Sequence, residues 1–244
     1  MADKPGVIVA FDHGPLGLLP GLDRMDALIS AFEDLPLDGL ILNYGVLKRF
    51  GRAQPSMPVT PIARLDGNRT VLGGDWSKSA EWELFYSVEA CQRVGARAAI
   101  VNLLLGGPAE MASLRVVAQA AAACQRAKLP LYVSAMCVGD EGADWPPGHR
   151  QAFSALMAYE LGADVVIVYE ATAGVLAEVR RWCPLPLYAQ GAPSAGHGRD
   201  LEAWAAQCVA AGAKGVIVGR SVWQSTDPGD TLRRLLVEME IWDR

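Results

Sequence analysis

Eight short runs rich in β-branched and other apolar residues alternate with amphipathic stretches along almost the whole chain, and this alternation limits its possible folds more than any other feature. Most of the runs are continuously apolar, which is typical of parallel strands covered on both faces. Eight similar βα units predict an α/β fold, a single (β/α)8 TIM barrel. The predicted strands are 7–12, 39–43, 60–66, 98–103, 130–135, 164–169, 185–190 and 215–219.

The stretches between these strands carry apolar residues at the i, i+3, i+4 spacing of helices. The phrase Gly-Ala followed by a charged residue recurs at Gly95, Gly162 and Gly212, and marks three helix-to-strand turns. Pro108 suits the first turn of the helix that follows it. The predicted helices are 23–33, 79–94, 109–127, 152–161, 175–181, 201–211 and 230–238, with a weaker one at 44–50.

A doubly wound open sheet is the alternative architecture, but no GxGxxG motif follows the first strand, so the barrel is favoured. A chain of 244 residues has the usual length of one such barrel. No linker or change in composition suggests a second domain. We therefore expect residues 1–244 to form one domain.

The net charge of −5, the absence of long apolar runs and the spacing of the cysteines together argue against several classes of partner and location. The chain has no basic stripe to neutralise the phosphates of a nucleic acid. We expect no signal peptide, because the first residues include no basic region and no small-residue cleavage site, and the sequence has no apolar run of the roughly 20 residues that span a bilayer. Its five cysteines are widely spaced, as in a cytoplasmic protein with reduced thiols. We expect neither nucleic acid nor membrane as a partner.

Small residues follow the seventh and eighth predicted strands, where such barrels often bind phosphate through backbone N–H groups. The first segment contains Gly191 and Ala192, and the second contains Gly219, Arg220 and Ser221. Glycine lets the backbone approach the phosphate, and the arginine adds a forked positive charge. The alternative is that the glycines only form tight turns and that Arg220 pairs with an acid. The pattern favours a phosphate site.

Candidate catalytic groups follow the first and sixth strands, because the active sites of these barrels lie at the carboxyl ends of the strands. Asp12 and His13 can act as base and acid, or Asp12 can form a loop cap for Gly14. Tyr169 and Glu170 follow the sixth strand, and a partly apolar mouth would raise the pKa of Glu170. Other polar residues expected there are Asn43, Tyr44, Asp66, Asn68, Arg69, Asn102, Asp140 and Gln190.

All three histidines, His13, His149 and His197, are expected in loops at the same face, which makes a metal site an alternative. They lack the HxH or HxxxH spacing of ligands, and we predict no metal and no cofactor. Cys137 suits a buried thiol better than a nucleophile. Among the tryptophans, Trp76 and Trp145 are the candidates for ligand contact.

Five segments together resemble the archaeal-type class I fructose-bisphosphate aldolases, a family of the aldolase superfamily that also includes aminodideoxyheptulosonate synthases and a quorum-signal thiolase. They are Phe11-Asp12-His13-Gly14, Leu65-Asp66-Gly67-Asn68-Arg69-Thr70, Gly162-Ala163-Asp164-Val165-Val166, Gly191-Ala192-Pro193 and Val218-Gly219-Arg220-Ser221-Val222-Trp223-Gln224. The resemblance covers about residues 7–225. It implies a barrel that binds phosphorylated ketoses, usually as a homo-oligomer.

The chain departs from this family at the two residues that carry its chemistry. The resemblance places a Schiff-base lysine on the sixth strand, where this chain has Ile167, and an acid/base tyrosine near the end of the fifth, where it has Met136 or Cys137. None of the five lysines is expected at a strand's carboxyl end, although Lys48 and Lys78 could reach from the upper loops. We therefore expect no Schiff base.

The favoured function is a carbon–carbon lyase or isomerase that acts on a small phosphorylated keto or hydroxy metabolite by acid/base chemistry. Asp12 or Glu170 would be the base, and His13 or Tyr169 the acid. Two alternatives remain: a non-catalytic protein that binds a phosphorylated metabolite, and a metal-dependent aldolase that uses His13 and His197. The substrate is not identified by the sequence.

Overall fold

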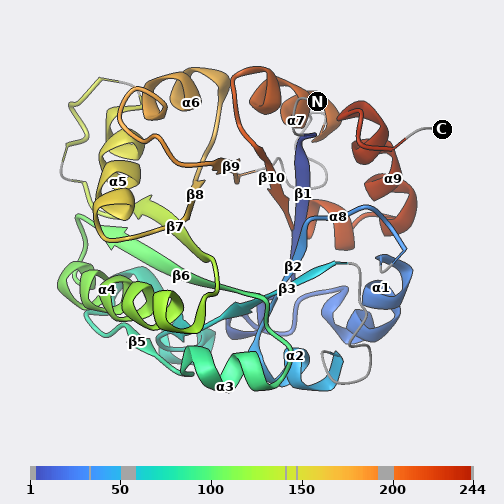
Figure 1. Ribbon diagram of the computed structural model, residues 1–244, viewed down its shortest axis with the longest axis horizontal. Coiled ribbons are helices and arrows are strands. Elements are labelled where there is room, and N and C mark those ends of the chain that lie inside the picture. The colour runs from blue at the N-terminus through green and yellow to red at the C-terminus, as the bar shows by residue number, and fades with distance from the viewer. Residues whose placement is uncertain are drawn as a thin grey trace.

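The computed structural model describes residues 4–32, 34–50, 59–140, 142–146, 148–191 and 201–242. Eight parallel strands form a closed barrel with helices around it (Figure 1). Around the barrel the strands are β1 (Gly6–Ala10), β10 (Gly215–Val218), β9 (Leu187–Ala189), β8 (Val165–Val168), β7 (Leu131–Cys137), β6 (Ala98–Leu105), β3 (Thr60–Arg64) and β2 (Gly39–Leu42).

The first and last strands close the barrel. Gly6 pairs with Gly215, and the register continues to Val9 and Val218. An open doubly wound sheet would leave both strands as free edges, so that alternative is wrong. All eight predicted strands are confirmed, and most end one or two residues earlier than predicted, whereas β6 and β7 each extend two residues further. The shorter ends leave Asp12 and Asp66 beyond their barrel strands.

Most of the helices connect consecutive barrel strands, the last two follow the final strand, and the helices surround the barrel (Figure 1). Ser87, Thr172 and Asp227 cap three of them, since each side chain accepts a backbone N–H of the first turn. Within the described residues the helices are α1 (Met25–Phe32), α2 (Tyr44–Phe50), α3 (Val88–Arg93), α4 (Glu110–Ala127), α5 (His149–Glu160), α6 (Ala173–Val179), α7 (Leu201–Ala210), α8 (Arg220–Trp223) and α9 (Pro228–Glu238).

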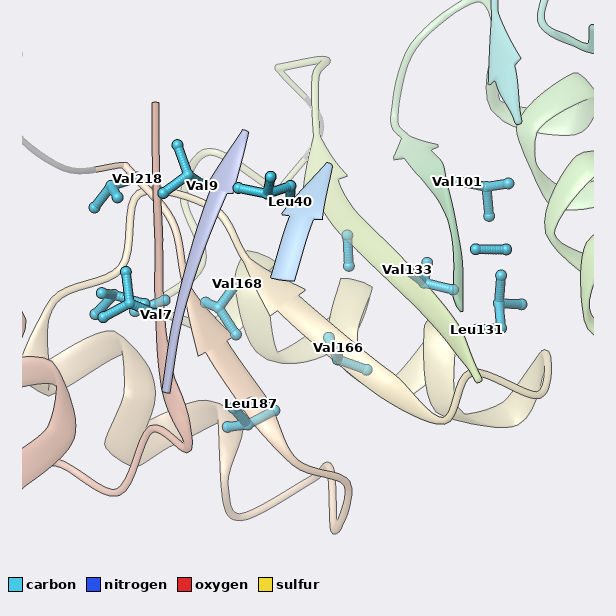
Figure 2. Packing of buried hydrophobic residues seen from close by; sticks show 14 of the residues in the cluster. Val7, Val9, Leu40, Val101, Leu131, Val133, Val166, Val168, Leu187 and Val218 are labelled. Atoms are coloured by element: carbon cyan, nitrogen blue, oxygen red, sulfur yellow. The ribbon is translucent and has the colours of Figure 1, made fainter. Parts of the chain in front are cut away.

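The core has two layers because side chains alternate along each strand. Residues such as Val7, Val9, Val166 and Val168 belong to the large cluster between strands and helices, part of which Figure 2 shows. The alternate residues fill the lumen. They are Ile8, Ala10, Ile41, Ile62, Ala98, Ile100, Ile167, Tyr188 and Ile217. Both faces of the barrel strands are therefore buried away from water, which explains the continuous apolar runs in the sequence.

The three glycines of the repeated helix-to-strand phrase adopt left-handed backbone conformations, with φ of 105° at Gly95, 97° at Gly162 and 94° at Gly212. This confirms that the phrase marks turns. Their backbone conformation is one that residues with a side chain rarely adopt. In the part of the chain that the structure describes, no helix has the length and apolar character that crossing a membrane requires.

The predicted helix 79–94 is wrong over its first half. That segment follows a 3-10 turn and contributes β5 (Glu83–Leu84), which pairs antiparallel with β4 (Asp66–Gly67), and only α3 is helical. Trp82 is buried and hydrogen-bonded to Asp66, and the Phe85 ring would come within 2.8 Å of a Cβ placed on Gly67. These tertiary contacts override a helical spacing that, on its own, predicted a surface helix.

Candidate functional site

A ring of polar side chains lies above the apolar residues of the lumen. Each member follows a lumen-filling residue by two positions, so the alternation of the strand carries it toward the same interior. Asp12 follows Ala10, Arg64 follows Ile62, and Asn102 follows Ile100. The carboxyl ends of β1, β3 and β6 thus bring acid, base and amide groups together, although β2 lies between β1 and β3 in the barrel.

Arg64 connects these strands through one guanidinium group. Its Nε donates to Oδ2 of Asp12 at 2.8 Å, and its Nη1 donates to Oδ1 of Asp66 at 3.1 Å and to Oδ1 of Asn102 at 2.9 Å. The Arg64 side chain is only 14% exposed and that of Asp12 only 12%. Such forked, charge-assisted bonds hold the acceptors in fixed positions.

Asp66 follows the carboxyl end of β3, and its side chain is fully buried beside Arg64. Besides Arg64, it accepts the indole N–H of Trp82 at 2.7 Å and the backbone N–H of Asn102 at 2.6 Å, both at Oδ2. Burial raises the pKa of Asp66 above its ordinary value, although Arg64 and the hydrogen bonds oppose this rise. Both carboxylate oxygens are occupied, so Asp66 suits a structural anchor better than a proton acceptor for a substrate.

His13 lies between the ring and the loop after β10. Its Nδ1 is 3.7 Å from Oδ1 of Asp12, is buried and has no hydrogen-bond partner. Its ring contacts the edge of the Trp223 ring with centroids 5.4 Å apart, and Trp223 is fixed by a 3.0 Å bond to the carbonyl of Ala10. A Cβ on Gly219 would come within 3.1 Å of Cε1 of His13. Any side chain at position 219 would therefore press on the His13 ring, which would have to shift by a few tenths of an ångström.

The charges around His13 and Asp12 define their protonation. Burial tends to raise the pKa of Asp12, but the Arg64 guanidinium and His13 lower it below its ordinary value. Burial lowers the pKa of His13; Asp12 opposes this, and the positive charges of Arg220 and Arg64 add to the decrease. At neutral pH the pair is therefore a carboxylate and a neutral imidazole.

The predicted phosphate loop after β10 lies beside this pair. Gly219 precedes α8, a four-residue helix that the sequence did not predict, and whose first turn leaves N–H groups of Arg220 and Ser221 without intrahelical partners. The side chain of Arg220 is exposed and has no hydrogen bond or ion pair with any residue of the described ranges. These donors lie on the same side of the mouth as His13.

Gly191, in the other predicted loop, has a φ of 106°, and a Cβ there would come within 2.9 Å of the backbone of Glu170. Tyr169 and Glu170 are both exposed, and Glu170 has a left-handed φ of 51°. Among described residues, no hydrogen bond or ion pair links Tyr169 or Glu170 to Asp12 or His13. Ala192 lies outside the described residues, as does the rest of that loop to residue 200.

Ile167, at the position where the resemblance implies a lysine, is completely buried in the lumen cluster. On β7, Ser134 contacts Gln190 across the mouth, so by alternation Met136 faces the interior, whereas Cys137 reaches the carbonyl of Arg150 on α5. The sequence predicted a buried thiol at Cys137, but the residue is only half-buried. Burial raises its pKa, which disfavours a role as nucleophile.

The five lysines all lie within the described residues, and none is at the carboxyl end of a barrel strand. Lys48 is exposed on α2, and Lys78 is 82% exposed and 3.9 Å from Asp75. Lys4 and Lys214 meet at the opposite end, where Nζ of Lys214 donates to the carbonyl of Lys4. Lys128 follows the end of α4.

The other candidates are more dispersed. His149 begins α5 rather than lying in a loop, with its Nδ1 3.7 Å from Glu178. His197 lies outside the described residues. The described part of the chain holds no group of three or more His, Cys, Asp or Glu side chains arranged for a metal ion. Trp76 packs edge-on against Trp82 below the rim.

Two residues of the site were missed from the sequence. Arg64 lies inside a predicted strand rather than after it, and Trp82 lies inside the helix that was wrongly predicted. The signal for Arg64 was its position in the alternation of side chains along the strand. A charged residue two positions after Ile62 lies on the same face of the strand as Ile62 and must point toward the mouth. Trp82 offered no comparable signal.

The family model described as DeoC/LacD family aldolase matches residues 6–225. A 2-amino-4,5-dihydroxy-6-oxo-7-(phosphonooxy)heptanoate synthase of Streptomyces griseus is 30% identical over 224 residues, which cover 91% of this chain and 80% of the relative. A 3-hydroxy-5-phosphonooxypentane-2,4-dione thiolase of Salmonella typhimurium is 26% identical, with 91% of this chain and 72% of that protein covered.

Among solved structures, an archaeal fructose 1,6-bisphosphate aldolase superposes with a TM-score of 0.83 at 22% identity, covering 97% of this chain and 94% of the other. At this identity the likeness concerns the fold, and it agrees with the closed barrel described above. The match to the family model extends from β1 to the segment that follows α8, and so includes every residue of the polar ring. The chain belongs to the DeoC/LacD family of aldolases.

Proposed function

We propose that this protein is an enzyme that makes or breaks a carbon–carbon bond in a small phosphorylated keto or hydroxy metabolite, by proton transfer and without a Schiff base. The two curated relatives described above carry names with a phosphonooxy group and a ketone, and each is matched over 91% of this chain. The free Arg220 side chain and the adjacent backbone donors supply the charge that a phosphate requires.

The observation that carries the proposal is the contact of His13 with both Asp12 and Gly219. An acid/base pair thereby lies next to the loop that would hold the phosphate. A bound phosphate would fix the reacting carbons near the imidazole, and such positioning is a large part of catalysis. Tyr169 and Glu170 form the neighbouring rim beside Gly191 and remain the alternative acid and base.

The electrostatics favour His13 as the group that moves the proton. Its Nδ1 faces Asp12, which suits the tautomer with hydrogen on Nδ1 and leaves Nε2 as the acceptor. Asp12 is a weak base because Arg64 lowers its pKa, but its negative charge stabilises an imidazolium. Asp12 would therefore act mainly through His13, by orienting the ring.

In the cleavage direction, Nε2 of His13 would take the proton of the substrate's β-hydroxyl group. The carbon–carbon bond then breaks, the hydroxyl carbon becomes a carbonyl, and the electron pair remains on the other fragment as an enolate. The imidazolium returns the proton to the enolate carbon, so that His13 ends unprotonated. Arg64 and Arg220, whose charges both act on His13, would stabilise the negative charge of the enolate.

A non-catalytic role is the second candidate because of one observation. The negative charge of the Asp12 carboxylate is already balanced by the Arg64 guanidinium, as it would be in a site that only binds. The phosphate loop and the buried Ile167 suit that role equally well. A homo-oligomer, which the family resemblance implies, is also part of the proposal, and sedimentation analysis would measure it.

Two measurements test the proposal. The protein is incubated with dihydroxyacetone phosphate and sodium borohydride and then weighed by mass spectrometry; we expect no gain, and a gain equal to a reduced imine would overturn the mechanism. The same substrate is incubated in deuterium oxide and followed by NMR. We expect deuterium to enter at the carbon beside the carbonyl with the natural protein and not with His13→Gln. Binding without such exchange would establish the second candidate instead.

A further inference from the structure

A cavity of about 600 Å³ lies outside the barrel mouth, at the carboxyl ends of β6 and β7. Leu105 and Cys137 form its strand side, and Arg150 and Phe153 of α5 form its helix side. None of Asp12, His13, Arg64 or Arg220 lines it. The side chain of Cys137 points toward α5, where it meets the carbonyl of Arg150, so the cavity opens between strands and helices rather than into the lumen.

Aromatic and glycine residues shape this cavity. The rings of Trp145 and Phe153 meet edge to face with centroids 5.8 Å apart, and both residues are almost half exposed. A Cβ on Gly142 would come within 2.9 Å of the Trp145 ring, so the ring lies directly against the backbone. Gly107 likewise has room only for hydrogen beside Val138. The result is a mostly apolar space, lined by two aromatic rings, of the size that holds small molecules.

Arg150 is the cationic residue of the cavity lining. Its Nη2 donates to the carbonyl of Gly139, and its Nε is buried without a hydrogen-bond partner. Within the described ranges, no carboxylate forms an ion pair with this guanidinium. A buried donor without a partner raises the free energy of the folded protein, and a positive charge left unpaired adds to it. A bound anion would remove part of both costs.

Glu110, on the opposite wall, decides which anion fits. Its Oε2 accepts the backbone N–H of Gly106 at 2.6 Å, so its charge is held at the edge of the cavity. A phosphate dianion would meet this negative charge with only one guanidinium to balance it. A carboxylate carries a single charge and matches the fork of an arginine.

We propose that this cavity is a second ligand site, which takes a small carboxylate with a planar apolar body. The carboxylate binds Arg150, and the planar group lies against Trp145 and Phe153. The site is separate from the phosphate loops, so its occupant need not be the substrate or product. The proposed chemistry does not use it.

Indole-3-acetate is a suitable probe because it combines one carboxylate with a flat ring. Titration calorimetry with the full-length protein measures its affinity, with indole as the neutral analogue and phenyl phosphate as the dianion. We expect indole-3-acetate to bind at least about tenfold more tightly than either, since a charge-assisted pair contributes that much. Equal affinities for all three, or no saturable binding of indole-3-acetate at millimolar concentration, would overturn the proposal.

Variants locate the binding. Arg150→Gln should weaken indole-3-acetate about tenfold or more, whereas Arg115→Gln, an exposed arginine on α4, should leave it unchanged. Trp145→Leu keeps Arg150 and its bond to Gly139, and should also weaken binding; it covers the case in which Arg150→Gln does not fold. Amide NMR shifts are expected at Gly106 and Gly107. Shifts centred on Gly219 instead would place the probe in the mouth and overturn the second site without affecting the proposed catalysis.

Discussion

The Nε of Arg64 lies 2.8 Å from Oδ2 of Asp12, so the carboxylate that precedes His13 is paired with a buried positive charge from β3, two strands away around the barrel. This contact has two effects. It keeps Asp12 ionised, because it lowers the pKa of the carboxyl below its ordinary value. It also makes the mouth depend on one arginine, since the same guanidinium holds Asp66 and Asn102.

Replacing Arg64 with alanine should therefore destabilise the protein strongly at neutral pH. Asp12 and Asp66 would be left buried without their counter-charge, and removing one partner of a buried ion pair costs about 3–5 kcal/mol. Urea unfolding at pH 7 measures the loss. The loss should shrink as the pH falls toward 4, because the two acids, with pKa values raised by the missing guanidinium, then take up protons and become neutral.

Arg69→Ala is the matched control for this experiment. Arg69 is exposed and donates only to the carbonyl of Gly73 and to Ser79, so its loss should cost about 1 kcal/mol and should not depend on pH in this range. A similar free-energy change for Arg64→Ala and Arg69→Ala would contradict the role assigned to Arg64.

The pKa of His13 should respond to its two kinds of neighbour in opposite directions. Burial lowers the pKa of His13 and the charge of Arg220 lowers it further, whereas the charge of Asp12 raises it. Asp12→Asn should therefore shift the titration of His13 to lower pH, and Arg220→Gln should shift it to higher pH. NMR of the imidazole C–H protons reads both, and the His13→Gln variant assigns the signal among the three histidines.

The folded protein should consequently lose stability in acid through His13. A folded-state pKa below the unfolded value means that the unfolded chain binds the proton more readily. The contribution of neutral His13 to the free energy of unfolding is complete above pH 6.5, the pKa of histidine in the unfolded chain. It is lost as the pH falls from 6.5 through the lower pKa of His13 in the folded protein. Unfolding midpoints of the natural protein and His13→Gln should converge over that interval; parallel curves would contradict the shift.

Arg220→Ala should weaken phosphorylated ligands selectively. Its side chain is exposed and free of described partners, so its removal breaks no bond of the folded protein. Loss of one charge-assisted contact predicts at least about tenfold weaker binding of dihydroxyacetone phosphate, with little change for dihydroxyacetone. Isothermal titration measures both, and equal losses for the two ligands would count against a phosphate contact.

The barrel could be predicted from the sequence because each strand is buried on both faces, so that a local apolar run is sufficient to mark it. The segment from Ser79 to Leu84 could not. Its position depends on Trp82 reaching Asp66, a contact between residues 16 apart that no helical or strand period encodes. Local spacing there predicted a helix, and a buried hydrogen bond determined the structure.

The candidate site was predictable to the extent that its residues follow strands. Asp12, His13, Gly219 and Arg220 were found by that rule, and the structure places all four on one side of the mouth. Arg64 was missed because the rule considers only residues at or beyond the end of a predicted strand, and Arg64 lies two residues before the end of the predicted strand 60–66. Applying the alternation of side chains inside the strand, counted from Ile62, would have included it.

The strongest test of the proposal that no Schiff base forms is to place an amine in the lumen. Ile167 is completely buried and lies in the strand next to Ser134, so Ile167→Lys would place its nitrogen in a dry interior below the mouth. Burial lowers the pKa of a lysine, and at pH 8 the amine would be largely neutral and nucleophilic. We expect this variant to gain the mass of a reduced imine when treated with dihydroxyacetone phosphate and borohydride.

Ile167→Met is the control, because it has similar length without an amine and should give no adduct. Circular dichroism establishes that both variants fold, since a buried lysine destabilises a core whereas methionine fits one. A folded Ile167→Lys protein that stays unlabelled would contradict the assignment of position 167 to the imine site. Labelling of the Met variant to the same extent would show that another lysine reacts, and that the covalent mechanism had not been lost with Ile167.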